Sequence, residues 1–278
     1  MTEKQVALLR GAIDYAGLFP PARLEMEPAV ENYRRYRVEE SSWALGRFVC
    51  PVGRLAEFAA ARRSGGGIWP IAAVGSGEAH EEASAIARFN QDHYGRSCVE
   101  ALEAKTPDGS AVRARAGASG GLQVFCEISP AAAEFRATAT AVREAGARAK
   151  LRTGGVVPEA IPSVEAVLSF LLVCLNLGLA FKATAGLHHA CRGLYALNYG
   201  PRAPEATMHG YMNLALAATA LVAGEGGAAA EHLLASSDVE ELSLESWSVE
   251  QIEAGRRLFV GFGSCSFEEP LQCLHPQA

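Results

Sequence analysis

Eight short β-like runs alternate with helical patterns along the chain, and this alternation constrains the fold more than any other sequence feature. Strands that alternate with helices form βα units, which assemble into a parallel sheet. The expected strands are 11–17, 46–51, 68–74, 99–104, 122–128, 149–154, 179–186 and 258–263. Helices are expected near 2–10, 26–38, 54–63, 79–92, 131–145, 163–177, 207–223 and 248–257, whereas the Gly- and Ala-rich stretch 107–121 gives a poor helix signal.

Two architectures fit this alternation, a closed (β/α)8 TIM barrel and an open, doubly wound sheet. The count of eight strands favours the barrel, as does the lack of a GxGxxG turn after the first strand. The 278 residues fit one barrel domain, 1–278, with an N-terminal helix. The connection between the seventh and eighth strands is unusually long, and we expect its residues 190–248 to form an insertion or lid on the active face.

Composition narrows the class of protein. Hydrophobic residues make up 49% of the chain and charged residues 20%, so it can bury a large core, which excludes intrinsic disorder. The net charge of −6 gives no basic footprint for nucleic acid. The longest apolar run, 166–175, is shorter than the roughly 20 residues of a membrane span, so we expect no membrane partner.

The N-terminus and the cysteines favour a cytoplasmic protein. The first residues lack a basic start followed by an apolar stretch, which a secretory signal would need. The seven cysteines form no CxxC pair, and several lie in apolar segments where cysteine packs as a small hydrophobe. The segment 163–178 is apolar nearly all round, which predicts either a deeply covered helix or a contact in a homo-oligomer.

Candidate site residues come from the polar positions late in each strand, because barrel enzymes place catalysis at the carboxyl ends of their strands. Lys150 and Arg152 alternate onto one face of the sixth strand, and Lys182 and Thr184 onto one face of the seventh. Glu127 ends the fifth strand. Glu103 and Lys105 occupy the same position on the fourth strand, and Asp14 lies near the end of the first.

Lys150 and Lys182 lie inside apolar strands, where a lysine is more readily explained by a role in a functional site than by contact with solvent. A buried amine is costly, and burial lowers its pKa, as does a neighbouring cation. A lysine with a lowered pKa attacks carbonyl carbons near neutral pH. The competing interpretation is structural, with Glu127 forming an ion pair with Lys150 or Arg152.

Three motifs resemble class I aldolases of the deoxyribose-phosphate aldolase type, which are Schiff-base TIM-barrel enzymes. AKLRTGG at 149–155 is similar to the family's Lys-x-x-Thr-Gly strand. FKATAG at 181–186 is similar to its second lysine strand, and FGSCS at 262–266 to its final phosphate-holding turn. Their order along the chain matches the family. The stretch IWPIAAVGS departs from it, since it supplies no acid where the family has a strand carboxylate.

The resemblance implies a role for each matching residue. Lys150 would form the imine and Lys182 would perturb it, while Gly186, Gly263, Ser264 and Ser266 would bind an anionic substrate. We add Glu127, His188 and His189 as catalytic candidates from their strand-end positions, and a further set as substrate contacts. That set is Arg152, Thr153, Thr184, His209 and Asn213.

A metal site is the alternative. Glu127, His188 or His189, and His209 are residue types that bind divalent cations, although no HxH or HExxH spacing is present. Adjacent histidines on a strand point in opposite directions, so we expect one of the pair in the site. The sequence therefore predicts a lysine-imine lyase without a cofactor that acts on a small, anionic or carbonyl-bearing molecule. The alternatives are a metal-dependent lyase or hydrolase and a ligand-binding barrel without turnover.

Overall fold

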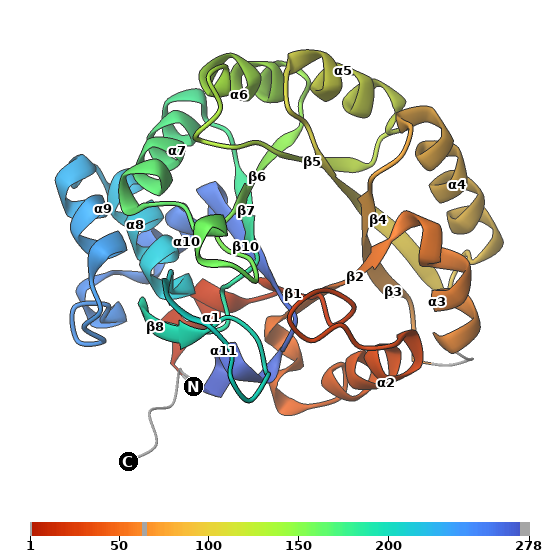
Figure 1. The fold of residues 1–278 in the computed structure, drawn as a ribbon, viewed down its shortest axis with the longest axis horizontal. Helices are drawn as coiled ribbons and strands as arrows, with labels where there is room; N and C mark the ends of the chain where they lie inside the picture. Colours follow the sequence, from red (N-terminus) through yellow and green to blue (C-terminus); the bar gives the residue numbers. More distant parts are fainter. Residues whose placement is uncertain (1, 63–65, 273–278) are drawn as a thin grey trace.

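Eight parallel strands close into a barrel in the computed structural model, which describes residues 2–62 and 66–272 (Figure 1). Around the barrel the order is β1-β10-β7-β6-β5-β4-β3-β2, and β1 pairs with both β2 and β10. The barrel strands are β1 Ile13–Tyr15, β2 Leu45–Pro51, β3 Trp69–Gly75, β4 Ser97–Lys105, β5 Gln123–Glu127, β6 Arg148–Arg152, β7 Phe181–Thr184 and β10 Phe259–Ser264. The predicted (β/α)8 barrel is confirmed, and its closure excludes the open sheet.

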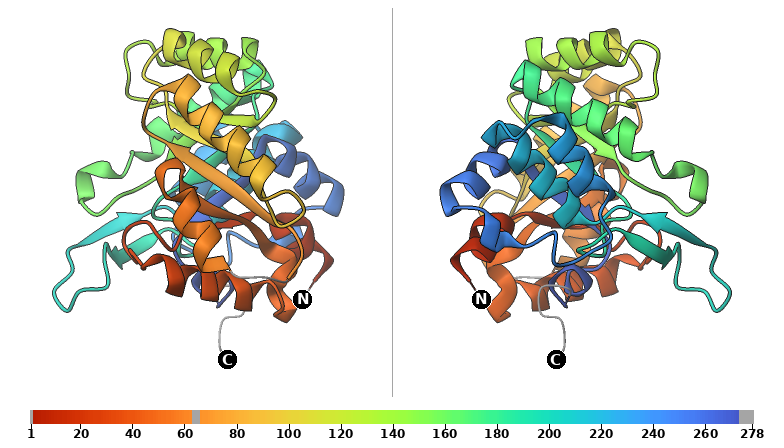
Figure 2. Two further views of the ribbon diagram at one scale, coloured as in Figure 1. Left: turned by 90° about the vertical axis from the view of Figure 1, so that its right-hand side faces the viewer. Right: turned by 90° about the vertical axis from the view of Figure 1, so that its left-hand side faces the viewer.

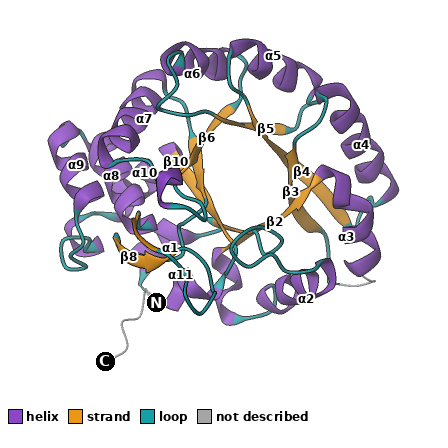
Figure 3. Cartoon of the chain, in the orientation of Figure 1, coloured by secondary structure: helices purple, strands orange, loops and turns teal. Residues whose placement is uncertain are grey.

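Helices form a ring outside the barrel (Figure 3). They are α1 Glu3–Leu9, α2 Met26–Tyr36, α3 Leu55–Arg62, α4 Ala79–Asp92, α5 Gly109–Ala118, α6 Phe135–Glu144, α7 Val164–Leu177, α8 Tyr211–Ala223, α9 Gly226–Ala235, α10 Val249–Leu258 and α11 Glu268–Gln272. Single 3₁₀ turns occur at Glu40–Ala44, Val52–Arg54, Pro158–Ala160 and Leu244–Ser246. Arg63, the last residue expected in the third helix, lies outside the described residues.

Helix α5 forms where the sequence gave a poor helix signal, and this expectation was wrong. Asp108 accepts hydrogen bonds from the backbone N–H groups of Ser110 and Ala111, so the first turn is capped. Val112 is buried against the barrel, and packing of one apolar side of a helix outweighs weak local propensity. The βα alternation is therefore unbroken around the ring.

Residues 190–248 contain a hairpin and two helices. The hairpin pairs β8 Gly193–Ala196 with β9 Glu205–Met208 in antiparallel register, outside the barrel sheet. It projects beyond the barrel in Figure 2. Helix α8 packs between β10, α7, α9 and α10 and is buried over most of its length. Only the hairpin portion of this connection reaches the cavity described below, through Ala196, Leu197 and Met208.

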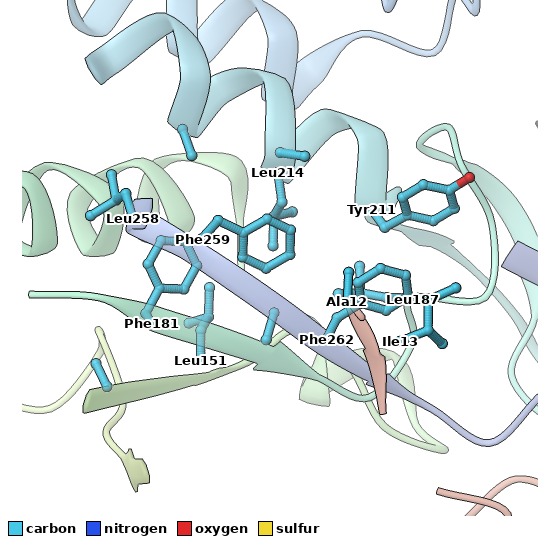
Figure 4. Packing of buried hydrophobic residues seen from close by; sticks show 14 of the residues in the cluster. Ala12, Ile13, Leu151, Phe181, Leu187, Tyr211, Leu214, Leu258, Phe259 and Phe262 are labelled. Atoms are coloured by element: carbon cyan, nitrogen blue, oxygen red, sulfur yellow. The ribbon is translucent and has the colours of Figure 1, made fainter. Parts of the chain in front are cut away.

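The apolar core has two parts. The larger lies between the barrel and its helices, where Phe181, Phe259 and Phe262 pack beneath α8 (Figure 4). The smaller is inside the barrel and is made by Val49, Ala72, Ala101 and Phe125. These four point into the barrel, since they alternate with the outward-facing residues of their strands. The polar groups described below occupy the rest of the barrel interior.

The apolar segment 163–178 is the outer helix α7. With the preceding 3₁₀ turn, Pro158–Leu177 is long and apolar enough to cross a membrane by length and composition, with a hydropathy of 1.9. In the barrel, however, α7 buries Val167, Phe170 and Cys174 against the sheet. Only 28% of the most apolar window is buried, so the interpretation of this segment as a deeply covered helix is not confirmed.

A close helix contact yields a stability prediction. Gly255 of α10 faces Thr219 of α8, and a Cβ at Gly255 would lie 2.2 Å from the Thr219 Oγ1 and 2.8 Å from its Cα. We expect Gly255→Ala to lower the free energy of unfolding by about 1–3 kcal/mol, because the helices must separate. The matched control is Gly117→Ala in α5, where a Cβ meets nothing within 4 Å. Chemical denaturation should show the control unchanged or slightly stabilised, and equal behaviour of both variants would contradict the contact.

Candidate active site

A cavity of about 450 Å³ opens at the carboxyl ends of the barrel strands. The last residues of five consecutive strands, β3 to β7, line it. They are Gly75, Lys105, Glu127, Arg152 and Thr184. This is the end at which barrel enzymes carry their active sites, so the strand-end rule used on the sequence leads to a real cavity.

Two lysines and one carboxylate occupy the floor of the cavity. Lys150 of β6 and Lys182 of β7 are direct register partners, so their side chains enter the barrel side by side. Glu103 of β4 lies between their amines, with Oε2 2.8 Å from the Nζ of Lys150 and Oε1 2.5 Å from the Nζ of Lys182. All three side chains are buried. A single carboxylate thus joins both amines.

Two further carboxylates complete the floor. Asp14 of β1 lies 2.5 Å from the Nζ of Lys182, and Glu127 of β5 lies 3.1 Å from the Nζ of Lys150. β10 separates β7 from β1 and presents Gly263 to the cavity, so no side chain of that residue blocks the path from Lys182 to Asp14. The floor therefore holds three carboxylates and two amines, and each amine touches two carboxylates.

The electrostatics of the floor follow from this pairing. Burial acts to raise the pKa of Glu103, but the charges of Lys150 and Lys182 outweigh it and lower that pKa to about 2. Burial acts to lower the pKa of Lys182, but Asp14 and Glu103 outweigh it and raise it. The ring of Phe125 lies below, with its centroid 5.3 Å from the Lys182 Nζ. Lys182 is therefore held as a cation.

This corrects one part of the sequence argument. Two adjacent inward lysines were expected to lower each other's pKa, but Lys182 is matched by two carboxylates and its pKa is raised instead. Lys150 is held more loosely. Its contacts are 2.8 and 3.1 Å rather than 2.5 Å, and its side chain is 7% exposed against 3% for Lys182. Of the two amines, Lys150 is the one better placed to meet a ligand.

The rim of the cavity is cationic. Arg152 and Lys105 line it, and neither has an ion-pair partner in the part of the chain that the structure describes. Arg115 also lines the rim but is neutralised by Glu82, which accepts hydrogen bonds from the backbone of Ser76 as well. The wall between rim and floor is apolar and includes Phe19, Pro20, Val49, Val74 and Met208. A small molecule with an anionic end suits this arrangement.

Only one of the predicted histidines lines the cavity. His188 does, whereas His189 stacks on Tyr195 with ring centroids 3.6 Å apart. The Nε2 of His209 lies 2.7 Å from the backbone oxygen of Pro162. Asn213 is fully buried, and its amide donates to the backbone oxygens of Leu233 and Ser236 and accepts from Arg192. His209 and Asn213 thus hold loops in place rather than reach the cavity.

The predicted substrate contacts divide in the same way. Arg152, Thr184, Gly186 and Gly263 line the cavity. Thr153 is turned away, and its hydroxyl donates to the backbone oxygen of Ala185 at 2.6 Å. Ser264 lies behind the wall against His188, and the Ser266 hydroxyl accepts from the backbone N–H of Glu269. The FGSCS turn therefore offers Gly263 and Cys265 to the cavity instead of its serines.

Asp14 and Glu103 lie on the floor of the cavity, although the sequence analysis assigned neither of them a catalytic or binding role. Both were visible as acidic residues near strand ends, and each lies among apolar neighbours in its strand. Glu103 also supplies the strand carboxylate that IWPIAAVGS lacks, from the neighbouring β4. Cys265 and Glu269 were missed as well: Cys265 lies within the FGSCS motif, whose serines and glycine were chosen instead, and nothing in the local sequence of Glu269 points to the site.

The fold and the site define a (β/α)8 barrel with a buried lysine–carboxylate floor at the catalytic end. Comparisons with models of protein families, with curated proteins and with solved structures find no match to the chain. The aldolase resemblance therefore depends on the residues themselves.

Proposed function

We propose that the protein is a lyase that forms an imine between Lys150 and a small carbonyl compound with an anionic group. One observation carries the proposal: two amines from adjacent strands share the buried carboxylate of Glu103 on the floor of a cavity. Ordinary structural ion pairs do not need a cavity above them. This arrangement supplies a nucleophile, a fixed cation and a proton acceptor together.

The proposed chemistry starts with transfer of a proton from the Lys150 ammonium to Glu127, 3.1 Å away. The free amine adds to the carbonyl carbon, and the carbinolamine loses water with a proton returned by Glu127. In the resulting iminium ion, the carboxylate of Glu127 takes the proton of the hydroxyl on the β carbon. The bond between the α and β carbons then breaks and the β carbon leaves as an aldehyde, while the electron pair of that bond forms the enamine double bond and the C=N π pair moves to the nitrogen. Glu127 returns its proton to the enamine carbon, and water hydrolyses the iminium ion that results, which restores Lys150. Lys182 keeps Glu103 ionised beside the developing positive charge.

The rim supports an anionic substrate. Arg152 and Lys105 are unpaired cations, and their attraction to a phosphate or carboxylate would place the carbonyl end of a short molecule toward the floor. Gly186 and Gly263 leave room for such a group at the ends of β7 and β10. We propose a substrate of a few carbon atoms, which the cavity of about 450 Å³ accommodates.

The metal-dependent alternative has less support. Among residues 2–62 and 66–272 no group of three His, Cys, Asp or Glu side chains is placed to hold a metal ion. Glu127 is engaged by Lys150, and His209 by Pro162. A barrel that only binds its ligand would have the same cavity, but Lys150 would not react with a carbonyl compound. Chemical trapping of an imine therefore separates the two alternatives.

We further propose a cytoplasmic location. The six cysteines within the described residues are all free, and Cys273 lies outside them. Free buried thiols suit a reducing compartment.

Borohydride trapping tests the proposed function. We expect incubation of the protein with glyceraldehyde 3-phosphate and sodium borohydride to give a stable secondary amine on Lys150, because hydride reduces the imine. Glyceraldehyde is the matched probe without the anion, and it should trap more slowly, since Arg152 and Lys105 have nothing to hold. Peptide mass mapping gives the site. Adducts spread over exposed lysines, with no excess at Lys150, would overturn the proposal, and equal rates for both aldehydes would overturn the anionic rim.

A further inference from the structure

A second cluster of reactive side chains lies on the wall of the cavity, apart from the lysines. Cys265 follows β10 and lines the cavity, as does His188 from the loop after β7. The Sγ of Cys265 lies 3.8 Å from the Nδ1 and 3.9 Å from the Nε2 of His188. Glu269 of α11 lies 3.1 Å from the Nδ1 of His188. The imidazole of His188 thus lies against both the thiol of Cys265 and the carboxylate of Glu269, and the three side chains come from three different segments.

The hairpin contributes a fourth member. The hydroxyl of Tyr199, in the turn between β8 and β9, donates to Glu269 Oε1 at 2.9 Å and lies 3.5 Å from the Sγ of Cys265. The Ser264 hydroxyl lies 3.3 Å from the Nδ1 of His188. The carboxylate is therefore fixed from two sides, by the imidazole and by the phenol. An orienting group of this kind keeps an imidazole in one position beside a nucleophile.

The charge of His188 fits this arrangement. Burial acts to lower the pKa of His188, but its contacts with Cys265 and Glu269 outweigh burial and raise that pKa to about 9. The groups that face it are Cys265 and Ser264 after β10, Glu269 on α11, and His189 in its own loop. The thiolate is the nucleophilic form of a cysteine, and an imidazolium beside it is placed to give a proton to a leaving group.

We propose that Cys265, His188 and Glu269 form a cysteine nucleophile site that takes the acyl group of a small activated ester or thioester. The Sγ of Cys265 attacks the acyl carbonyl carbon, a carbon–sulfur bond forms, and the bond to the alcohol or thiol leaving group breaks. His188 gives its proton to that leaving group. Water then attacks the thioester carbonyl carbon with loss of one proton to His188, and the carbon–sulfur bond breaks. The carboxylic acid is released, and Cys265 returns to a thiolate beside the His188 imidazolium.

The proposal is independent of the imine. Within residues 2–62 and 66–272, no hydrogen bond or ion pair joins this cluster to Lys150 or Lys182, whose ion-pair partners are Asp14, Glu103 and Glu127. The two sites share the cavity, and the acylation uses neither lysine. Failure of imine trapping would leave this proposal standing, and the reverse also holds.

The probe is p-nitrophenyl acetate with the full chain. We expect a burst of about one equivalent of p-nitrophenolate and an acetyl group on Cys265 by peptide mass mapping. Cys265→Ala should lose the burst. Cys98→Ala is the matched control, because Cys98 is a more exposed thiol whose Sγ lies against the backbone oxygen of Val99, and the burst of this variant should equal that of the wild type. Acetylation of Lys150 or Cys98 instead, or no burst, would overturn the proposal.

Glu269 is a positioning residue, and Glu269→Gln tests that role. We expect the burst to slow by about tenfold or more. The titration midpoint of His188 followed by NMR should also move from about 9 toward its ordinary value, because the partner carboxylate is gone. If Cys265→Ala does not fold, the rate of iodoacetamide labelling of Cys265 against Cys98 in the wild type decides the matter. Equal labelling rates of the two thiols at neutral pH, or an unmoved His188 midpoint, would overturn the assignment.

Discussion

Replacement of Lys150 by methionine is expected to abolish borohydride trapping, whereas the same replacement of Lys182 leaves a slower reaction in place. Methionine keeps the length of the side chain and removes the amine that forms the imine. Lys182 acts through charge, since it is held as a cation between Asp14 and Glu103. Trapping rates of the two variants, measured with the same aldehyde, check this expectation.

Peptide mapping of the adduct separates the two roles further. Lys182→Met removes the positive charge that balances two buried carboxylates, and this loss could prevent the variant from folding. Peptide mapping of the adduct on the wild-type protein gives an answer that does not depend on the folding of the variant. An adduct on Lys182 would reverse the roles.

Replacement of Glu103 by glutamine is expected to lower the free energy of unfolding by about 3–5 kcal/mol, because it leaves two buried ammonium groups short of a partner. Glu103 is 2% exposed and contacts both Nζ atoms. The matched control on the same strand is Glu100→Gln. Glu100 is exposed and pairs only with Arg47 at 3.2 Å, so its loss should cost less than about 1 kcal/mol. Guanidinium denaturation of the two variants checks the difference, and similar losses would show that Glu103 is not the centre of the floor.

The same carboxylate predicts the acid limb of stability. The pKa of Glu103 is lowered to about 2 in the folded protein, from an ordinary value near 4.5. The unfolded chain therefore binds a proton first as the pH falls. The stabilisation is fully present above about pH 4.5 and is lost progressively toward pH 2. In Glu103→Gln, this part of the acid loss should be absent from a series of denaturation curves measured across that range.

Local sequence patterns located the barrel strands. Runs such as 46–51 and 68–74 are apolar, short and bounded by turn residues, and each corresponds to a barrel strand within one or two residues. The hairpin β8–β9 and the helix α9 were not predicted, because their residues lack a clear apolar period. Their positions depend on the barrel and on α8, α7 and Tyr199.

The sequence by itself determined which polar residues share a face of each strand. Alternation along a strand is a local property, so Lys150 and Arg152 share a face whatever lies next to them. Tertiary structure decided what those polar residues meet. Asp14 and Lys182 are far apart in the chain, and only the closure of the sheet through β10 brings their charged atoms to 2.5 Å. The charge state of a buried amine depends on such neighbours, because at Lys182 the two carboxylates of Asp14 and Glu103 together outweigh the cost of burial.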